Sequence, residues 1–430
     1  MPQPTSRLCA LTTELIEYIV AQLELEDLRV LRLVCKNLSH KTLHYFGSTY
    51  FAHVRTDLSR TSLQKLQQLS RHEQLGNHVR TLFIRGPHRM GWGYSWERSP
   101  SHSLLFPHPG VQTLQDALLA LKNCRSFCIY NDGRPGKLYE RGCLRPSDAV
   151  AIVLYIISET GLPVRSFAAD FFTFCDYSVD ISRLHLASYQ KPGFRSAWSQ
   201  LQELSLRQRV NRQEFDWVLD LILAAPNLRC LSLDFGSEMW NSFFDLASSC
   251  KRFPKLQELN ISSINFHNDS LFEFLFRFGD SLRILRLAHF SLDRTQSWKS
   301  VFKLLGTKLP VLETISVCFL SEWIWIERNG ISGQVREMLV FPGFLESPKP
   351  CWLNGWEVVN NPEFGDSFGF RRMSKDPSVP ELEHTNFIVT GDHWGSRRKG
   401  RVLGISYSGA NIGDVLDMLA ESAIPMRDTR

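Results

Sequence analysis

The chain has 430 residues, which is room for two or three ordinary domains or for one long array of repeats. Hydrophobic residues make up 43% of it and charged residues 22%, a balance that is typical of a folded chain and excludes a disordered one. The formal net charge of +5 is interpreted as an excess spread thinly over the chain, so it predicts neither a nucleic-acid partner nor an anionic membrane surface.

The apolar segments are too short for a membrane-spanning protein. The longest uninterrupted one, residues 149–157, has nine residues, whereas a helix that crosses a bilayer needs about 20. Glu14 and Glu17 interrupt the apolar stretch at residues 8–23, so we expect no secretory signal there. These features predict a chain that resides in the cytoplasm, the nucleus or both, where its ten cysteines remain free thiols.

The first fifty residues carry three short helical patterns. In the first pattern, apolar residues recur at every fourth position, at Leu11, Leu15, Ile19 and Leu23. The second begins near Asp27 and carries Leu28, Leu31 and Val34, and the third covers residues 38–46. Three such helices bury too little surface to be stable alone, so their remaining apolar faces imply a partner, either the rest of this chain or another protein.

The order of these residues resembles the F-box motif. The resemblance rests on Leu11-Thr-Thr-Glu-Leu15, Ile19, Leu23, Asp27-Leu28 and Leu31-Arg-Leu-Val-Cys-Lys36, with Leu38 after them. This sequence departs from the family at Thr12, where a proline is usual, and it has no motif tryptophan after Lys36. The alternative is a generic amphipathic helical lead-in to the next domain.

The resemblance implies docking on the Skp-type adaptor of an SCF (Skp–cullin–F-box) ubiquitin ligase. By motif position, the adaptor contacts are predicted at Leu11, Thr12, Leu15, Ile19, Leu23, Leu28, Leu31 and Val34. Some of these side chains must instead form the small core of the motif, and the sequence leaves that division open.

A hexad of the form apolar-x-x-apolar-x-apolar recurs through the rest of the chain. Its clearest copies are residues 201–206, 228–233, 256–261, 282–287 and 312–317, whose starts are 27, 28, 26 and 30 residues apart. Weaker copies at 79–84, 124–129 and 164–169 are followed by longer insertions. The period and the hexad resemble irregular leucine-rich repeats, which form a strand and a helix per repeat.

The predicted fold class is therefore α/β. A three-helix F-box at residues 1–52 precedes an irregular leucine-rich repeat solenoid at 53–340, and residues 341–430 form a cap that covers its last apolar face. The pattern also resembles the irregular F-box leucine-rich repeat proteins abundant in fungi.

The repeat pattern predicts a working surface, because alternate residues of each strand point away from the core. The predicted set is Phe83, Arg85, Tyr130, Asp170, Ser205, Arg207, Ser232, Asp234, Asn260, Ser262, Arg286 and Ser316. A mixed polar surface with aromatic residues at one end suits recognition of a protein substrate.

Two irregular regions and one basic cluster stand outside the repeats. Residues 86–110 carry Trp92, Tyr94, Trp96 and Phe106, which either bind a partner or fold back on the array. Residues 131–147 form a second loop rich in glycine, arginine and proline. The basic cluster at 397–401 is interpreted as a solvated loop.

The catalytic patterns in the sequence are incomplete. Residues 404–409 lack the glycine that a nucleophile elbow needs after its serine, and residues 133–137 lack the full phosphate loop. Cys124, Cys128 and Cys143 do not have the spacing of a zinc site. We expect no catalysis, metal or cofactor.

Taken together, the two resemblances imply a substrate-recognition subunit of an SCF ligase, which contacts a cullin through the adaptor and binds a protein substrate that the sequence does not identify. A leucine-rich repeat scaffold or regulator with no ligase connection is the alternative. A hydrolase in the carboxy-terminal third is a third interpretation, which would need a serine, a histidine and an acid to converge in space.

Overall fold

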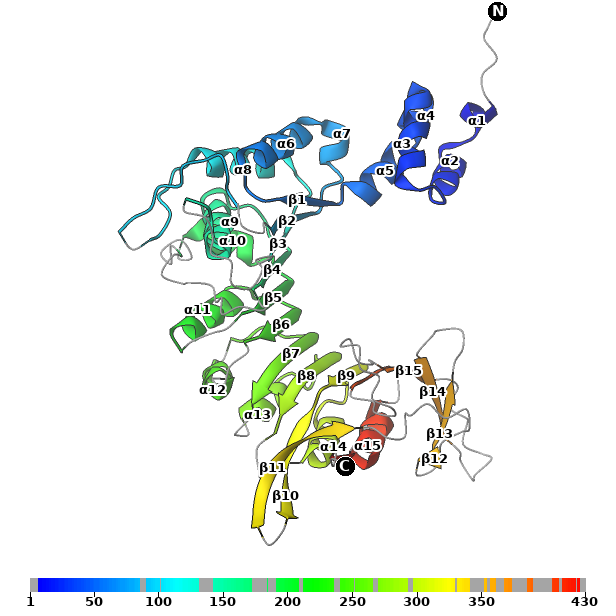
Figure 1. Cartoon of the computed structure of the whole chain (residues 1–430), viewed down its shortest axis with the longest axis vertical. Helices are drawn as coiled ribbons and strands as arrows, with labels where there is room; N and C mark the ends of the chain where they lie inside the picture. Colours follow the sequence, from blue (N-terminus) through cyan, green and yellow to red (C-terminus); the bar gives the residue numbers. More distant parts are fainter. Residues whose placement is uncertain are drawn as a thin grey trace, which may run out of the picture. The chain divides into compact units, whose positions relative to one another are not determined.

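The structure is a computed structural model, and its residues fall into two compact units, 1–201 and 202–430, each described by itself (Figure 1). The residues described are 7–85, 90–100, 102–130, 142–171, 184, 191–208, 212–235, 240–250, 252–265, 270–292, 297–328, 331–340, 352–353, 356–360, 367–372, 385–389, 404–409, 412–422 and 424–425. The predicted cluster at 397–401 and most of the loop at 131–147 lie outside them.

Short helices form the first fifty residues. They are α1 (Arg7–Ala10), α2 (Thr13–Val20), α3 (Leu25–Val34), α4 (Lys36–Lys41) and α5 (Leu43–Tyr50). Helix α3 ends where Cys35 becomes extended. The third predicted helix is divided into α4 and α5 at Thr42, whose hydroxyl donates to the Leu38 carbonyl oxygen at 2.8 Å and competes there with the regular helical pattern.

Four parallel strands follow in the first unit. They are β1 (His53–Thr56), β2 (Thr81–Arg85), β3 (Ser126–Tyr130) and β4 (Ser166–Asp170), and each pairs with the next in register. Parallel neighbours need crossover connections. Helices supply them: α6 (Arg60–Arg71), α7 (Glu73–Gly76), α8 (Pro109–Ala120) and α9 (Pro146–Thr160), with α10 (Pro192–Trp198) after β4.

The second unit repeats this arrangement. Its parallel strands are β5 (Glu203–Arg207), β6 (Cys230–Asp234), β7 (Glu258–Asn265), β8 (Ile284–Ser291) and β9 (Thr314–Cys318). The helices between them are α11 (Arg212–Leu223), α12 (Trp240–Ser249), α13 (Ser270–Phe276) and α14 (Trp298–Lys308).

Every predicted hexad forms a strand that begins at its third residue, and its three apolar positions are buried. In the first unit these positions are Val79, Leu82, Ile84, Cys124, Phe127, Ile129, Val164, Phe167 and Ala169, each at most 1% exposed. Cys124 is a core residue, and its burial raises the pKa of the thiol to about 12. In the second unit none of the corresponding side chains exceeds 3%.

The second unit ends in antiparallel structure. Strand β16 (Gly404–Ser408) pairs with β9, and α15 (Ile412–Ser422) packs on α14. A long hairpin consists of β10 (Ser321–Arg328) and β11 (Ile331–Val340). The remaining strands are β12 (Trp352–Leu353), β13 (Trp356–Asn360), β14 (Ser367–Arg372), β15 (Thr385–Val389) and β17 (Ile424–Pro425). None of the helices in the described residues is long and apolar enough to cross a bilayer.

The aromatic segment after β2 largely folds back. Trp96 is buried, its Nε1 donates to the Gly91 carbonyl oxygen at 2.8 Å, and its ring stacks on His108 at 3.9 Å. Phe106 stacks on Tyr155 of α9 at 4.0 Å. Of the four aromatic residues named from the sequence, Trp92 alone is exposed.

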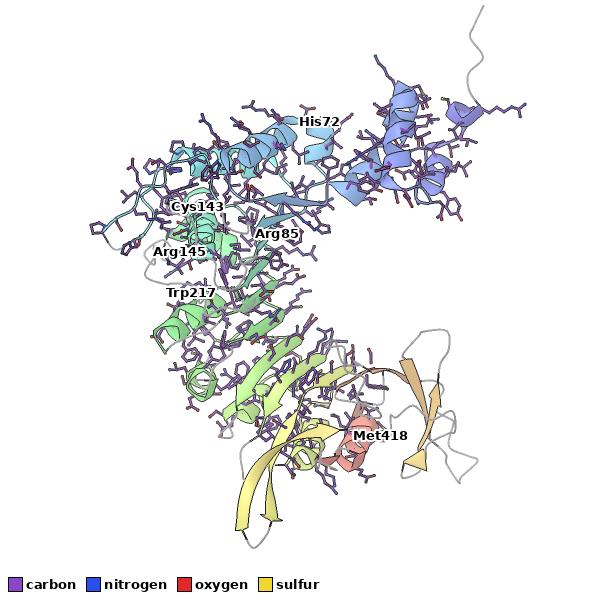
Figure 2. The ribbon with its side chains drawn as sticks, in the orientation of Figure 1. His72, Arg85, Cys143, Arg145, Trp217 and Met418 are labelled. Atoms are coloured by element: carbon purple, nitrogen blue, oxygen red, sulfur yellow. The ribbon has the colours of Figure 1, made fainter. Side chains whose placement is uncertain are left out.

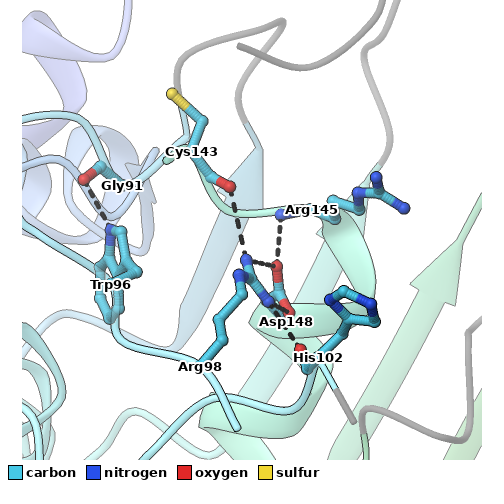
Figure 3. A network of polar contacts seen from close by, with 7 residues as sticks. All are labelled: Gly91, Trp96, Arg98, His102, Cys143, Arg145 and Asp148. Atoms are coloured by element: carbon cyan, nitrogen blue, oxygen red, sulfur yellow. Dashed lines mark hydrogen bonds and ion pairs between the residues drawn. The ribbon is translucent and has the colours of Figure 1, made fainter. Parts of the chain in front are cut away.

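A buried ion pair holds this segment to the start of α9 (Figure 3). The Arg98 guanidinium donates to both carboxylate oxygens of Asp148, at 2.9 and 2.7 Å, and to the His102 carbonyl oxygen at 3.0 Å. Asp148 also accepts the Arg145 N–H at 2.7 Å, and its side chain is fully buried. The hydrogen bond to Asp148 raises the pKa of Arg98, so the guanidinium stays charged.

We expect Asp148→Asn to lower the free energy of opening of α9 by about 3 kcal/mol, because it leaves the partly buried Arg98 guanidinium without an opposite charge and turns an amide NH2 toward other donors. Native-state amide hydrogen exchange in α9 measures this. The control is Glu159→Gln, which removes the partly exposed Lys191–Glu159 pair and should cost less than about 1 kcal/mol. Equal effects of the two variants would contradict the structural role of Asp148.

Candidate functional site

The amino-terminal helices enclose a small apolar core. Its fully buried members are Ile16, Val20, Leu28 and Leu38. Partly buried side chains packed against them are Leu8, Cys9, Leu11, Leu23, Leu31, Cys35, Tyr45, Phe46 and Tyr50. Each helix thus contributes the side chains of one face to this core. Within the described residues, no other element covers the opposite faces of α2 and α3.

Long basic side chains hold the helices of this core together. Lys41 Nζ donates to the carbonyl oxygens of Cys9 at 2.9 Å and Leu11 at 2.5 Å. Arg32 donates to the Ser39 carbonyl oxygen and to the Thr42 hydroxyl, both at 3.0 Å, and lies over the Phe46 ring at 4.3 Å. Partial burial lowers the pKa of Arg32. These bonds satisfy carbonyl groups at chain turns and fix the relative positions of the helices.

The thiol of Cys35 has a local structural role. The Leu38 N–H donates to Cys35 Sγ at 3.5 Å, so the thiol caps α4, and Cys9 Sγ lies 3.5 Å away. The bond from Leu38 N–H, followed by the one to Cys9, lowers the pKa of Cys35.

The uncovered faces of α2 and α3 carry large apolar side chains. On α2 the exposed large apolar side chains are Leu15 (52%), Tyr18 (74%) and Ile19 (38%). On α3 they are Val30 (64%), Leu33 (86%) and Val34 (66%). Both sets have the i, i+3, i+4 spacing that places side chains on one helical face. We call these six residues the apolar docking surface.

The structure divides the sequence-predicted contacts into three groups. Thr12, Leu15, Ile19 and Val34 are exposed, whereas Leu11, Leu23 and Leu31 are half-buried against the core. Leu28 is fully buried among the other core residues, so it belongs to the small core of the motif, an assignment that the sequence left open. Tyr18, Val30 and Leu33 are exposed apolar residues that the sequence analysis did not name, although Tyr18 stands at the i+3 position relative to Leu15.

Residues 8–42 match the family model of the F-box domain. The chain carries an F-box domain. The core and the apolar docking surface both belong to this domain, apart from the core-packing contributions of Tyr45, Phe46 and Tyr50 that follow it. A search of the curated proteins finds no match for this chain.

The open sheet face of the first unit carries an aromatic cluster. Phe83 of β2 stacks on Tyr130 of β3 at 5.8 Å, and His53 of β1 meets Phe83 edge-on at 5.8 Å. Tyr130 is paired in register with Arg85 of β2 and Asp170 of β4, so its stack with Phe83 is diagonal, and Figure 2 shows Arg85 at the end of β2. Partial burial is the main cause that raises the pKa of Tyr130. The sequence predicted four of these residues and missed His53.

The open face of the second unit carries a polar row. Ser205, Ser232, Asn260, Arg286 and Ser316 are paired in register across β5 to β9, and Ser406 of β16 extends the row. Arg286 forms an ion pair with Glu258 and donates to Asn260 Oδ1 at 3.0 Å. The sequence named the first five of these residues but missed Ser406, because β16 is antiparallel and far along the chain.

The adjacent row contains one wrong prediction. Arg207, Asp234 and Ser262 are also in register, but Asp234 is only 5% exposed. Its carboxylate lies 3.5 Å from Arg207 Nε, and its carbonyl oxygen accepts the Gln208 N–H at 2.8 Å. Asp234 therefore holds β5 and β6 together and is not a surface residue.

Ser408 lies in the segment 404–409, which the sequence analysis compared with a nucleophile elbow. Ser408 Oγ is hydrogen-bonded to Thr314 Oγ1 at 2.8 Å. Within the described residues, no three histidine, cysteine or acidic side chains gather in a way that could hold a metal ion.

We expect Leu28→Ala to lower the free energy of local unfolding of the F-box domain by about 3 kcal/mol, since it opens a cavity in a very small core. Leu33→Ala is the matched control, because this leucine is 86% exposed, and we expect a change below about 0.5 kcal/mol. Amide hydrogen exchange of α2 to α4 measures both values. A larger loss for Leu33→Ala would refute the division between core and docking surface.

Proposed function

We propose that the chain is the substrate-recognition subunit of an SCF-type ubiquitin ligase. The observation that carries the proposal is the apolar docking surface on a domain that matches the F-box family. F-box domains bind Skp-type adaptors as a class, and here the contacts would come from Leu15, Tyr18 and Ile19 of α2 and from Val30, Leu33 and Val34 of α3. Thr12 would lie at the edge of this interface.

The energetics of the surface support a protein partner. Soluble proteins rarely keep contiguous large apolar residues in water unless a partner covers them. Each square ångström of apolar surface removed from water contributes roughly 25 cal/mol, and a few central side chains usually dominate the affinity. Leu33 and Tyr18, which are the most exposed large residues of the two helices, would gain the most from being covered.

The remainder of the chain would be an irregular leucine-rich repeat solenoid. The coincidence of hexads, strands and buried apolar positions supports this, with residues 53–340 as the array, 341–430 as its cap and 1–52 as the F-box region. Phe83, Arg85, Tyr130 and Asp170 of the first unit, and Ser205, Arg207, Ser232, Asn260, Ser262, Arg286 and Ser316 of the second, would contact the protein substrate.

The mechanism would be that of a tether. The F-box domain would hold the adaptor and, through it, a cullin, while the strand face holds the substrate in the cytoplasm or the nucleus. Binding to one assembly raises the effective concentration of the substrate near the ubiquitin-carrying enzyme. The chemistry would belong to the other subunits, and this chain would contribute positioning alone.

The test is binding of the full chain to a purified Skp-type adaptor. We expect the double variant Leu15→Asp, Leu33→Asp to bind about 100-fold more weakly than the wild type, because it places two charges in an apolar interface. Both residues are exposed, so the variant should remain folded by circular dichroism.

The matched control is Leu119→Asp, Leu246→Asp, which changes two leucines of α8 and α12 that are 49% and 41% exposed. This control should bind like the wild type. No binding by a folded wild type would favour the scaffold alternative, and equal binding by both double variants would place the interface elsewhere.

A further inference from the structure

Arginine occupies the second position of each hexad in the first unit. The residues are Arg80, Arg125 and Arg165, which directly precede the paired part of β2, β3 and β4. Backbone hydrogen bonds align them, because the Arg125 N–H donates to the Arg80 carbonyl oxygen at 3.1 Å and the Arg165 N–H to that of Arg125 at 2.7 Å. We call these three residues the arginine ladder.

The ladder is exposed and has no acidic partner. All three residues are solvent-exposed, and in the described part of the chain their guanidinium groups form no hydrogen bond or ion pair. The turns that lead into the strands, residues 77–80, 121–125 and 161–165, add Lys122 and contain no carboxylate. The pKa of the neighbouring His78 is lowered, mainly by burial, then by His44 and to a smaller extent by the positive charge of Arg80.

The second unit uses the same hexad position differently. There Arg283 and Glu313, which occupy that position before β8 and β9, form an ion pair. Neighbouring strands lie about 4.8 Å apart, so alternating charges attract whereas a run of like charges repels. Three adjacent arginines therefore do not serve the stability of the sheet, and binding an anionic partner would remove their repulsion.

The charge distribution along the chain agrees with this. In residues 1–201 basic side chains outnumber acidic ones, whereas in residues 202–430 acidic side chains are in slight excess. The net charge of +5 is therefore not spread evenly, which corrects the interpretation drawn from composition. Part of the basic excess in residues 1–201 comes from the arginine ladder and Lys122.

We propose that the arginine ladder binds an acidic polypeptide segment, rich in aspartate or glutamate, of a partner protein. Guanidinium groups accept carboxylates in a bidentate geometry, and carboxylates on one face of a peptide recur every 5–7 Å, roughly the strand spacing, within reach of long arginine side chains. A nucleic acid is disfavoured, since tight backbone binding uses about 6–10 phosphate contacts and the patch offers four cations.

The test uses the full chain and fluorescence anisotropy. The probe is a fluorescein-labelled peptide of twelve residues that alternates glutamate and alanine, and the comparison probes are the glutamine–alanine peptide and a single-stranded DNA of twelve nucleotides. The ladder variant is Arg80→Gln, Arg125→Gln, Arg165→Gln. The control variant is Arg71→Gln, Arg195→Gln, Arg252→Gln, which removes three exposed arginines and the same charge.

We expect the wild type to bind the glutamate peptide more tightly than the glutamine peptide, with an affinity that falls as salt rises. The ladder variant should lose about tenfold in affinity, and the control variant less than about twofold. Equal losses in both variants, or the absence of wild-type binding, would overturn the proposal. Tighter binding of the DNA, lost in the ladder variant, would also overturn it. The ladder variant should still bind the Skp-type adaptor, so this test is independent of the proposed ligase role.

Discussion

The structure depends above all on the burial of three apolar side chains in each hexad. In both units the first, fourth and sixth positions lie beneath the sheet, at most 3% exposed, while the residues between them face outward. A parallel strand cannot be stable without a covering layer on its apolar side, and the helices that connect successive strands supply that layer. The same alternation produces the rows of polar and aromatic side chains on the open face, so the packing and the surface pattern have one origin.

The F-box domain illustrates the opposite situation, in which there is too little chain to bury both faces of its helices. Its core uses Ile16, Val20, Leu28 and Leu38, and the bonds from Lys41 and Arg32 fix the helices around it. The apolar residues left outside, such as Tyr18 and Leu33, gain nothing from the fold itself. Soluble domains rarely keep such residues in water, which is the physical support for the proposed partner.

Much of the fold could be predicted from the sequence because it depends on local periodicity. The hexads located every parallel strand after β1, and the spacing of leucines located α2 and α3. The division of the F-box leucines was not predictable, because Leu15 and Leu28 have the same residue type and similar spacing, and only the tertiary arrangement buries one of them. Arg98 and Asp148 are fifty residues apart, and nothing local indicates that they meet. Asp234 was misplaced because strand alternation assigns it to the outer face, whereas the structure buries it beside Arg207 of the neighbouring strand.

Only some of the side chains on the open sheet face could be predicted from the sequence. Register follows from the hexads, so the rows that contain Phe83 and Ser232 were predictable. Ser406 was not, because it joins its row through an antiparallel pairing with β9 from residues far along the chain. The arginine ladder was visible in the sequence as a repeated second position, but its significance depends on the exposure and the lack of acidic partners that the structure provides.

The central claim is that the exposed faces of α2 and α3 form the interface with a Skp-type adaptor. Hydrogen–deuterium exchange of the full chain, measured with and without the adaptor, tests it most directly. We expect protection in residues 13–20 and 25–34 and unchanged exchange in β5 to β9. Protection confined to residues 202–430, or no protection anywhere under saturating adaptor, would contradict it.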